Sequence, residues 1–142
     1  MKWLLFIFCY LFTSAILAQG INLTIQITGI DPSQGHIQLA LYNSAENFPK
    51  EGKEFQVFRV PVTANTLSTT INNLPPGKYA IALFHDLNND GICNKNILGF
   101  PLEGYGFSNN VKPRIRVPRF EKAAFDLEQQ NNLKISVLYG RF

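Results

Sequence analysis

INLTIQIT, residues 21–28, indicates the fold class, because it alternates apolar and polar side chains without interruption. Strict alternation is the period of a β-strand, whose successive side chains point to opposite faces of a sheet. One face of this strand is therefore predicted to be buried. The segment DPSQG, residues 31–35, begins two residues later and supplies the proline and glycine of a turn.

Similar strand patterns return along the rest of the chain. Strands are predicted around residues 37–41, 55–62, 67–71, 79–86, 123–127 and 133–139. The run YAIALFHD, residues 79–86, is apolar on both faces, as is typical of a central strand covered on both sides. We therefore predict an all-β fold, an antiparallel β-sandwich of immunoglobulin or transthyretin-like type. It would have seven or eight strands and one long loop at one end.

Residues 1–18 are predicted to be a signal peptide. Lys2 precedes the apolar stretch WLLFIFCYLFTSAILA, and Ala18 is a small residue at which cleavage before Gln19 would fit. A membrane anchor is the alternative, because the stretch approaches the length that spans a bilayer. A strand pattern starts directly after the stretch, which favours cleavage. We expect a single β-sandwich domain over residues 19–142, exported to the periplasm, the cell surface or the medium, with no transmembrane segment left.

The cysteine count and the charge balance argue against several classes of function. Cleavage would remove Cys9, so Cys93 would have no partner for an internal disulfide. It is expected to be a small, buried or half-buried side chain, or a thiol that cross-links a partner. Thirteen Lys and Arg stand against ten Asp and Glu, which argues against nucleic acid as a partner. Two histidines and one cysteine are too few for an ordinary zinc site.

HDLNNDGICNKN, residues 85–96, places oxygen-bearing side chains at alternate positions around Gly91. Calcium takes several oxygen ligands, and a tightly curled loop can direct alternate residues to one point. On this pattern the candidate metal ligands are Asp86, Asn88, Asp90, the main-chain carbonyl of Ile92, and Asn94. The pattern fails at its twelfth position, where Ile97 replaces the expected glutamate. Glu103 is the nearest later carboxylate that could fold back onto the loop.

Two interpretations of this loop stay open. In the first, calcium is the cofactor and binds weakly, with a dissociation constant of about 0.1 to 1 mM and neutral oxygens added by Asn96 or Asn109. In the second, no metal is needed. Asp86 and Asn88 then accept hydrogen bonds from main-chain N–H groups as Asx turns, and Asp90 forms a tight turn with the glycine after it.

The residues after this loop form no predicted strand until about Lys112, and so long a gap in a compact domain is usually functional. Phe100, Tyr105 and Phe107 place three rings close together within it. These rings suit a platform for a sugar or a peptide. They equally suit an anchor that packs a long loop over the end of the core.

The whole segment HDLNNDGICNKNILGFPLEGYGFSNN, residues 85–110, resembles the signature of the bacterial "domain of unknown function 2141" family of small exported proteins. LYNSAENFPK, LPPGKYAIALFHD and PRFEKAAFDL resemble the segments around that signature, so the resemblance covers nearly the whole chain after residue 18. It implies an exported β-sandwich and little about activity. Asn94 departs from the aspartate that the family pattern leads us to expect, which removes one anionic ligand.

VKPRIRVPRF, residues 111–120, carries basic residues two apart, which would line one face of an extended segment: Lys112, Arg114 and Arg116. The apolar residues between them, Ile115 and Val117, would then point the other way. Such a stripe suits an acidic surface polysaccharide, lipid phosphate or the carboxylates of another envelope protein. A solvated sheet edge, protected by charge and proline, is the alternative.

Few residues are suited to catalysis. His85 and Asp86 are neighbours on a predicted strand, so their side chains point to opposite faces and cannot form a relay with each other. Cys93 with His85 as its base is another arrangement that could act. We predict an exported, non-catalytic binding or structural module whose partner is unknown. The alternative is a small exported enzyme of hydrolase type that uses His85 and Asp86 or Cys93.

Overall fold

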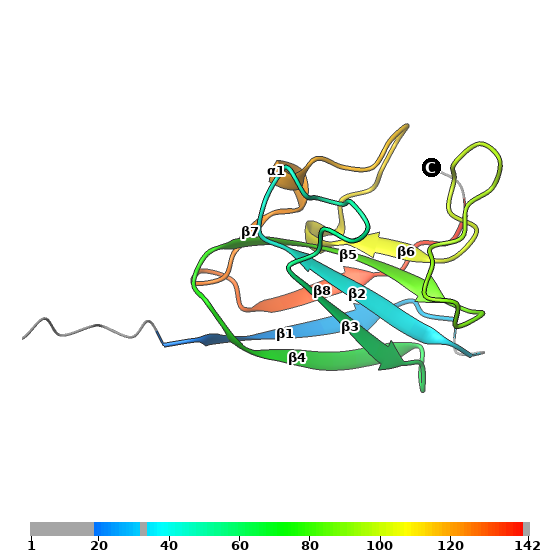
Figure 1. The fold of residues 1–142 in the computed structure, drawn as a ribbon. Coiled ribbons are helices and arrows are strands. Elements are labelled where there is room, and N and C mark those ends of the chain that lie inside the picture. Colours follow the sequence, from blue (N-terminus) through cyan, green and yellow to red (C-terminus); the bar gives the residue numbers. More distant parts are fainter. Residues whose placement is uncertain (1–18, 32–33, 141–142) are drawn as a thin grey trace, which may run out of the picture.

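The structure, a computed structural model, describes residues 19–31 and 34–140 (Figure 1). Two β-sheets pack face to face. The first has the order β4-β1-β8, with β4 at Thr66–Leu74, β1 at Ile21–Thr28 and β8 at Asn132–Ser136. The second has the order β3-β2-β5-β6: Gln56–Pro61, His36–Tyr42, Lys78–Asp86 and Tyr105–Phe107. The predicted all-β sandwich is confirmed, whereas the predicted signal peptide lies outside the described residues.

The main core lies between the sheets. In β1 the alternation buries Leu23, Ile25 and Ile27 completely, and each such burial contributes about 1.5 to 3 kcal/mol. Inward-facing residues of the other strands complete the core, among them Ile37, Leu39, Leu41, Ile71, Ile81, Leu83, Leu133 and Ile135. The period-two pattern thus places one side of each strand against the opposite sheet.

Two details differ from the predicted arrangement. The chain forms a short helix, α1 (Phe120–Ala123), where the strand 123–127 was predicted to begin, and only β7 (Phe125–Asp126) pairs with β5. In addition, β8 runs parallel to β1 although the sequence predicted antiparallel sheets. The reason is that β8 does not follow a hairpin. The chain crosses from β7 to the other sheet and enters it at the end where β1 begins.

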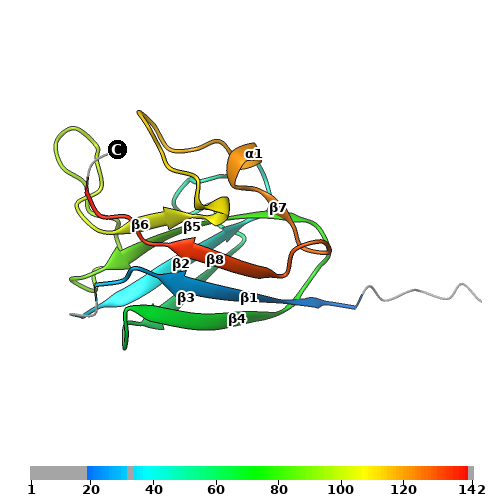
Figure 2. The same ribbon diagram turned by 180° about the vertical axis from the view of Figure 1, so that it is seen from behind.

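The second sheet is also covered on its outer face. A second group of buried residues, the outer cluster, lies there: Tyr42, Phe48, Ala80, Tyr105, Phe107 and Ala123. The covering segment, residues 43–55, and α1 lie on this side of the molecule in both views (Figures 1 and 2). The prediction that the strand at residues 79–86 is covered on both sides is therefore confirmed.

The predicted gap between residues 86 and 112 is not all loop. It contains β6 and a 3-10 turn, η1 (Ser108–Asn110). What remains irregular is the long loop, residues 87–104, and the basic segment, residues 111–119. β6 was missed because three residues, one of them glycine, are too few to show alternation. Within the described ranges, no helix has the length and apolar character needed to cross a membrane.

Candidate functional site

Asp86 ends β5 and holds the base of the long loop. Its side chain is fully buried, and its Oδ2 forms an ion pair with Nη2 of Arg59 on β3 at 2.7 Å. Oδ1 accepts a hydrogen bond from the N–H of Asp90 at 3.1 Å, and Oδ2 accepts one from the N–H of Gly91 at 2.9 Å. The carboxylate therefore joins the edge strand, the central strand and the loop.

Glu103 holds the other end of the long loop. It folds back and is buried, with 6% of its surface exposed. Its Oε1 accepts a hydrogen bond from the N–H of Leu87 at 3.0 Å, and its Oε2 accepts one from the N–H of Asn94 at 3.2 Å. Asp86 and Glu103 thus accept hydrogen bonds from four main-chain N–H groups at the two ends of the loop.

Asp90 organises the turn between these two anchors. Its Oδ2 accepts hydrogen bonds from the side-chain amides of Asn88 at 2.8 Å and Asn94 at 2.9 Å, while its Oδ1 accepts one from the N–H of Ile92 at 2.8 Å. Oδ1 of Asn88 accepts a hydrogen bond from the N–H of Asp90 at 3.2 Å. Gly91 has a φ of +77°, which allows the tight turn. The structure therefore contains the Asx turns of the metal-free interpretation.

All six predicted metal ligands belong to this network, but their three carboxylates are directed at separate donors. Across the residues that the structure describes, no group of three His, Cys, Asp or Glu side chains is placed to hold a metal ion. Asn96 and Asn109 do not join the network. Asn96 accepts hydrogen bonds within its own turn, from the N–H groups of Leu98 and Phe100, whereas Asn109 donates to main-chain carbonyls on and just after α1.

His85 and Asp86 lie on opposite faces of β5 and share no partner. His85 is fully buried, and its Nε2 donates a hydrogen bond to the carbonyl of Gln34 at 2.8 Å. Its Nδ1 forms a hydrogen bond with the hydroxyl of Tyr139 at 2.8 Å. That hydroxyl in turn accepts one from the N–H of Asp31 at 2.8 Å. Both ring nitrogens are thus used in structural hydrogen bonds.

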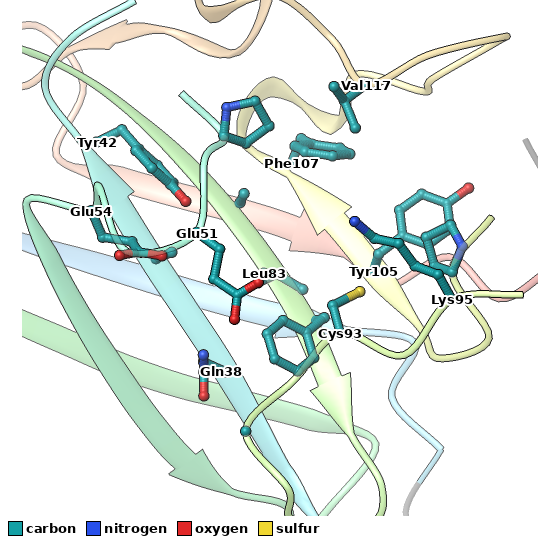
Figure 3. Close-up of a pocket in the computed structure, with 16 residues that line it drawn as sticks. Gln38, Tyr42, Glu51, Glu54, Leu83, Cys93, Lys95, Tyr105, Phe107 and Val117 are labelled. Carbon is teal, nitrogen blue, oxygen red and sulfur yellow. The ribbon is translucent and has the colours of Figure 1, made fainter. Parts of the chain in front are cut away.

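A pocket of about 150 Å³ opens on the outer face of the second sheet, beside the long loop (Figure 3). Its floor consists of outward-facing residues of β2, β5 and β6, among them Gln38, Ala40, Ala82, Phe84, Tyr105 and Phe107. Ala40 and Ala82 are directly paired across β2 and β5, and their small side chains leave the hollow. Tyr105 and Phe107 are each only 6% exposed, so they anchor the chain as well as line the pocket.

Three irregular segments form the walls of this pocket. The covering segment supplies Pro49, Glu51 and Glu54, the long loop supplies Gly91, Cys93, Lys95 and Pro101, and the basic segment supplies Val117. Figure 3 shows Glu51 and Glu54 on one side of the opening and Lys95 on the other. None of these three charged residues takes part in an ion pair within the described part of the chain.

Burial raises the pKa of two titratable groups that line the pocket. Burial, helped by the charges of Glu54 and Glu51, raises the pKa of the Tyr42 phenol, so Tyr42 stays neutral and its hydroxyl donates to the carbonyl of Lys50 at 3.3 Å. Burial also raises the pKa of the Cys93 thiol to about 11. The predicted half-buried position of Cys93 is confirmed. Its thiol lines the outer pocket, whereas His85 faces the space between the sheets.

The pocket was not predicted from the sequence, although the sequence contains a signal for it. Ala40 and Ala82 are small residues at outward positions of two predicted strands. The strand register that places these two alanines opposite each other is not visible in the sequence. The walls come from three loops, and loop paths are not set by the period-two pattern.

The sequence was also compared with known protein families. A model of the family described as "Uncharacterized protein conserved in bacteria (DUF2141)" matches residues 25–136. This chain belongs to the DUF2141 family. The DUF2141 match includes the long loop with both of its anchors and every residue that lines the pocket. Comparisons with curated proteins and with solved structures give no match.

Proposed function

We propose that this DUF2141 chain is an exported, non-catalytic binding module that holds a small molecule in the pocket on its outer face. The pocket itself carries the proposal. It is concave and mainly apolar, and it has a few polar groups at its opening, as ligand sites in proteins have. Its volume of about 150 Å³ suits a molecule near the size of benzene. Export rests on the signal-peptide pattern of residues 1–18.

The charges at the opening favour a small zwitterion as the ligand. Glu51 and Glu54 would attract a positive group on one side, and Lys95 would attract a negative group on the other (Figure 3). An apolar body between the two groups would lie over Ala40 and Ala82. A free aliphatic amino acid has this combination of groups.

The hydrogen bonds around the candidate catalytic residues support a role without chemistry. Both ring nitrogens of His85 have other partners, and Asp86 is held by Arg59 and two N–H groups. The raised pKa of Cys93 keeps its sulfur as the thiol at neutral pH, and the thiol is a poor nucleophile.

Three probe molecules test the proposed ligand class. Valine carries both charges, isobutylamine lacks the carboxylate, and isovalerate lacks the amine. In an NMR titration of the exported protein, valine is expected to bind most tightly and to shift the amide resonances of Cys93 and Lys95. The double substitution Glu51→Gln and Glu54→Gln is expected to weaken valine and isobutylamine binding about tenfold.

Isovalerate provides the internal control, because it has no positive group and its binding to that double variant should not weaken. Glu128→Gln is a control variant, because it removes a negative charge from an exposed position away from the pocket. The proposal fails if none of the three probes shifts the pocket resonances. It also fails if the double variant binds valine as tightly as the wild type does.

A second candidate function is a weak calcium site in the long loop, favoured by the groups around Asp90. The amides of Asn88 and Asn94 and the carbonyl of Ile92 gather near its carboxylate. Rotating both amides by half a turn would present oxygens in place of nitrogens. The proposed ligands are Asp86, Asn88, Asp90, Ile92, Asn94 and Glu103, although Asp86 and Glu103 would have to share their present hydrogen bonds with the ion.

A thermal melt tests the calcium site. With a dissociation constant of about 0.1 to 1 mM, 1 mM calcium would stabilise the fold by about 0.4 to 1.4 kcal/mol. The melting temperature should then rise between a chelator and 1 mM calcium, and Asp90→Asn should remove the rise. Magnesium at the same concentration is the control ion. Equal melting temperatures in calcium and in chelator would contradict the proposed calcium site.

A further inference from the structure

Two segments project from the same side of the molecule as α1. They are residues 92–102 of the long loop and the basic segment, residues 111–119, and both views place them side by side (Figures 1 and 2). Lys95 and Val117, one from each segment, line the same pocket, which confirms that the segments are neighbours. We call these two segments the loop tips.

The loop tips expose large aliphatic side chains to solvent. Six of the nine large apolar residues that are exposed in the described part of the chain lie on them: Ile92, Ile97, Leu98, Leu102, Ile115 and Val117. Ile97 is completely exposed, Ile115 is 88% exposed and Leu98 is 71% exposed. Apolar side chains gathered in this way mark an interaction surface, because solvent exposure contributes nothing to the fold.

The same tips are uniformly basic. Their sequences contain five basic side chains, all exposed, and no Asp or Glu: Lys95, Lys112, Arg114, Arg116 and Arg119. None of the five forms an ion pair with another described residue. The sequence predicted an extended segment with Ile115 and Val117 turned away from the basic side chains. Residues 111–119 form no strand and bend at residues 114–116, so the segment is not extended throughout, and both apolar side chains are exposed.

We infer that the loop tips bind the surface of a lipid bilayer that carries anionic headgroups. The basic side chains attract lipid phosphates, and the aliphatic side chains enter the boundary between headgroups and acyl chains. A soluble polyanion such as an acidic polysaccharide would bind the charges and leave the aliphatic residues in water. A bilayer accommodates both features, which is why it is the partner that these tips fit best.

This inference does not depend on a ligand in the pocket. The pocket proposal rests on the charges and floor of a concavity, whereas the membrane surface rests on side chains that point into solvent at the tips. Among the exposed apolar and basic side chains of the loop tips, only Lys95 and Val117 also line the pocket.

Vesicle sedimentation tests the inference. We expect the exported protein to sediment with vesicles of phosphatidylcholine and phosphatidylglycerol and to stay in solution with vesicles of phosphatidylcholine alone. Each basic residue near an anionic surface raises partitioning about fivefold, so Arg114→Gln with Arg116→Gln should lower it about 25-fold. Leu98→Asn with Ile115→Asn should lower it more than tenfold, because these side chains can no longer enter the apolar boundary.

Matched variants on other faces serve as controls. Lys78→Gln with Lys134→Gln removes the same charge from β5 and β8, and Val57→Asn removes an exposed aliphatic side chain from β3. Both controls should sediment like the wild type, and circular dichroism should show that every variant is folded. Equal sedimentation with both kinds of vesicle would overturn the inference. So would a loss in the arginine variant but not in the aliphatic variant, which would indicate a purely ionic polyanion site.

Discussion

At the scale of single residues, buried carboxylates organise the part of the molecule that the sequence marks as unusual. Asp86 and Glu103 lie at the two ends of the long loop, and each accepts hydrogen bonds from two main-chain N–H groups. Both acidic residues could be identified from the sequence, because a metal site with converging carboxylate oxygens was expected there. The sequence did not reveal Arg59 as the partner of Asp86, because that pair depends on the register of three strands.

Asp86→Ala is expected to lower the free energy of unfolding by about 2 to 4 kcal/mol. The substitution leaves the N–H of Gly91 without its acceptor, leaves the N–H of Asp90 with only Oδ1 of Asn88, and removes the partner of Arg59. Urea denaturation measures the change. Arg59→Gln is the control and should cost less, because both N–H groups keep their acceptor. A stability loss in Arg59→Gln as large as that in Asp86→Ala would contradict this role.

Cys93 should react slowly with thiol reagents in the folded protein. Burial raises its pKa from 9.0 to about 11, so the thiolate fraction near pH 8 falls about a hundredfold. A raised pKa in the fold also means that this thiol contributes stability below about pH 9, which is lost as the pH rises toward 11. Rates with a disulfide reagent, measured in buffer and in urea, test the shift. Equal rates in the two conditions would contradict it.

At the scale of elements, the long strands could be predicted from the sequence, whereas the short elements next to them could not. The alternation in residues 21–28 and the two-sided apolar run of residues 79–86 correspond to β1 and β5 because burial on one or both faces imposes those patterns. β6 and α1 are too short to show a periodic pattern of apolar residues in the sequence. Their conformation depends on tertiary contacts. Ser108, for example, accepts a hydrogen bond from the N–H of Ile81 and donates one to the carbonyl of Ala123.

The long loop should loosen when its second anchor is weakened. Glu103→Gln keeps one acceptor oxygen but turns an amide group toward an N–H donor, which should cost about 1 kcal/mol. Amide hydrogen exchange at Leu87 and Asn94 is then expected to be about fivefold faster. Glu121→Gln, an exposed residue of α1, should leave both rates unchanged. Unaltered exchange in Glu103→Gln would show that other contacts hold the loop.

At the scale of the whole molecule, one sandwich supports two apolar layers. The core between the sheets stabilises the fold, and the outer cluster fixes the covering segment and α1 against the second sheet. The pocket lies on that sheet, beside the outer cluster and the long loop. This arrangement could not be predicted from the sequence, because it depends on where three loops meet over two facing alanines.

The most direct test of a binding function fills the pocket while keeping the fold. Ala40→Leu places a larger side chain on the pocket floor, where Ala40 faces outward and is only partly buried. Titration with valine, followed through the amide resonances of Cys93 and Lys95, should give saturable shifts in the wild type. The same titration should give no shifts in a folded Ala40→Leu protein. Equal valine binding by both proteins, or no binding by the wild type, would contradict the account.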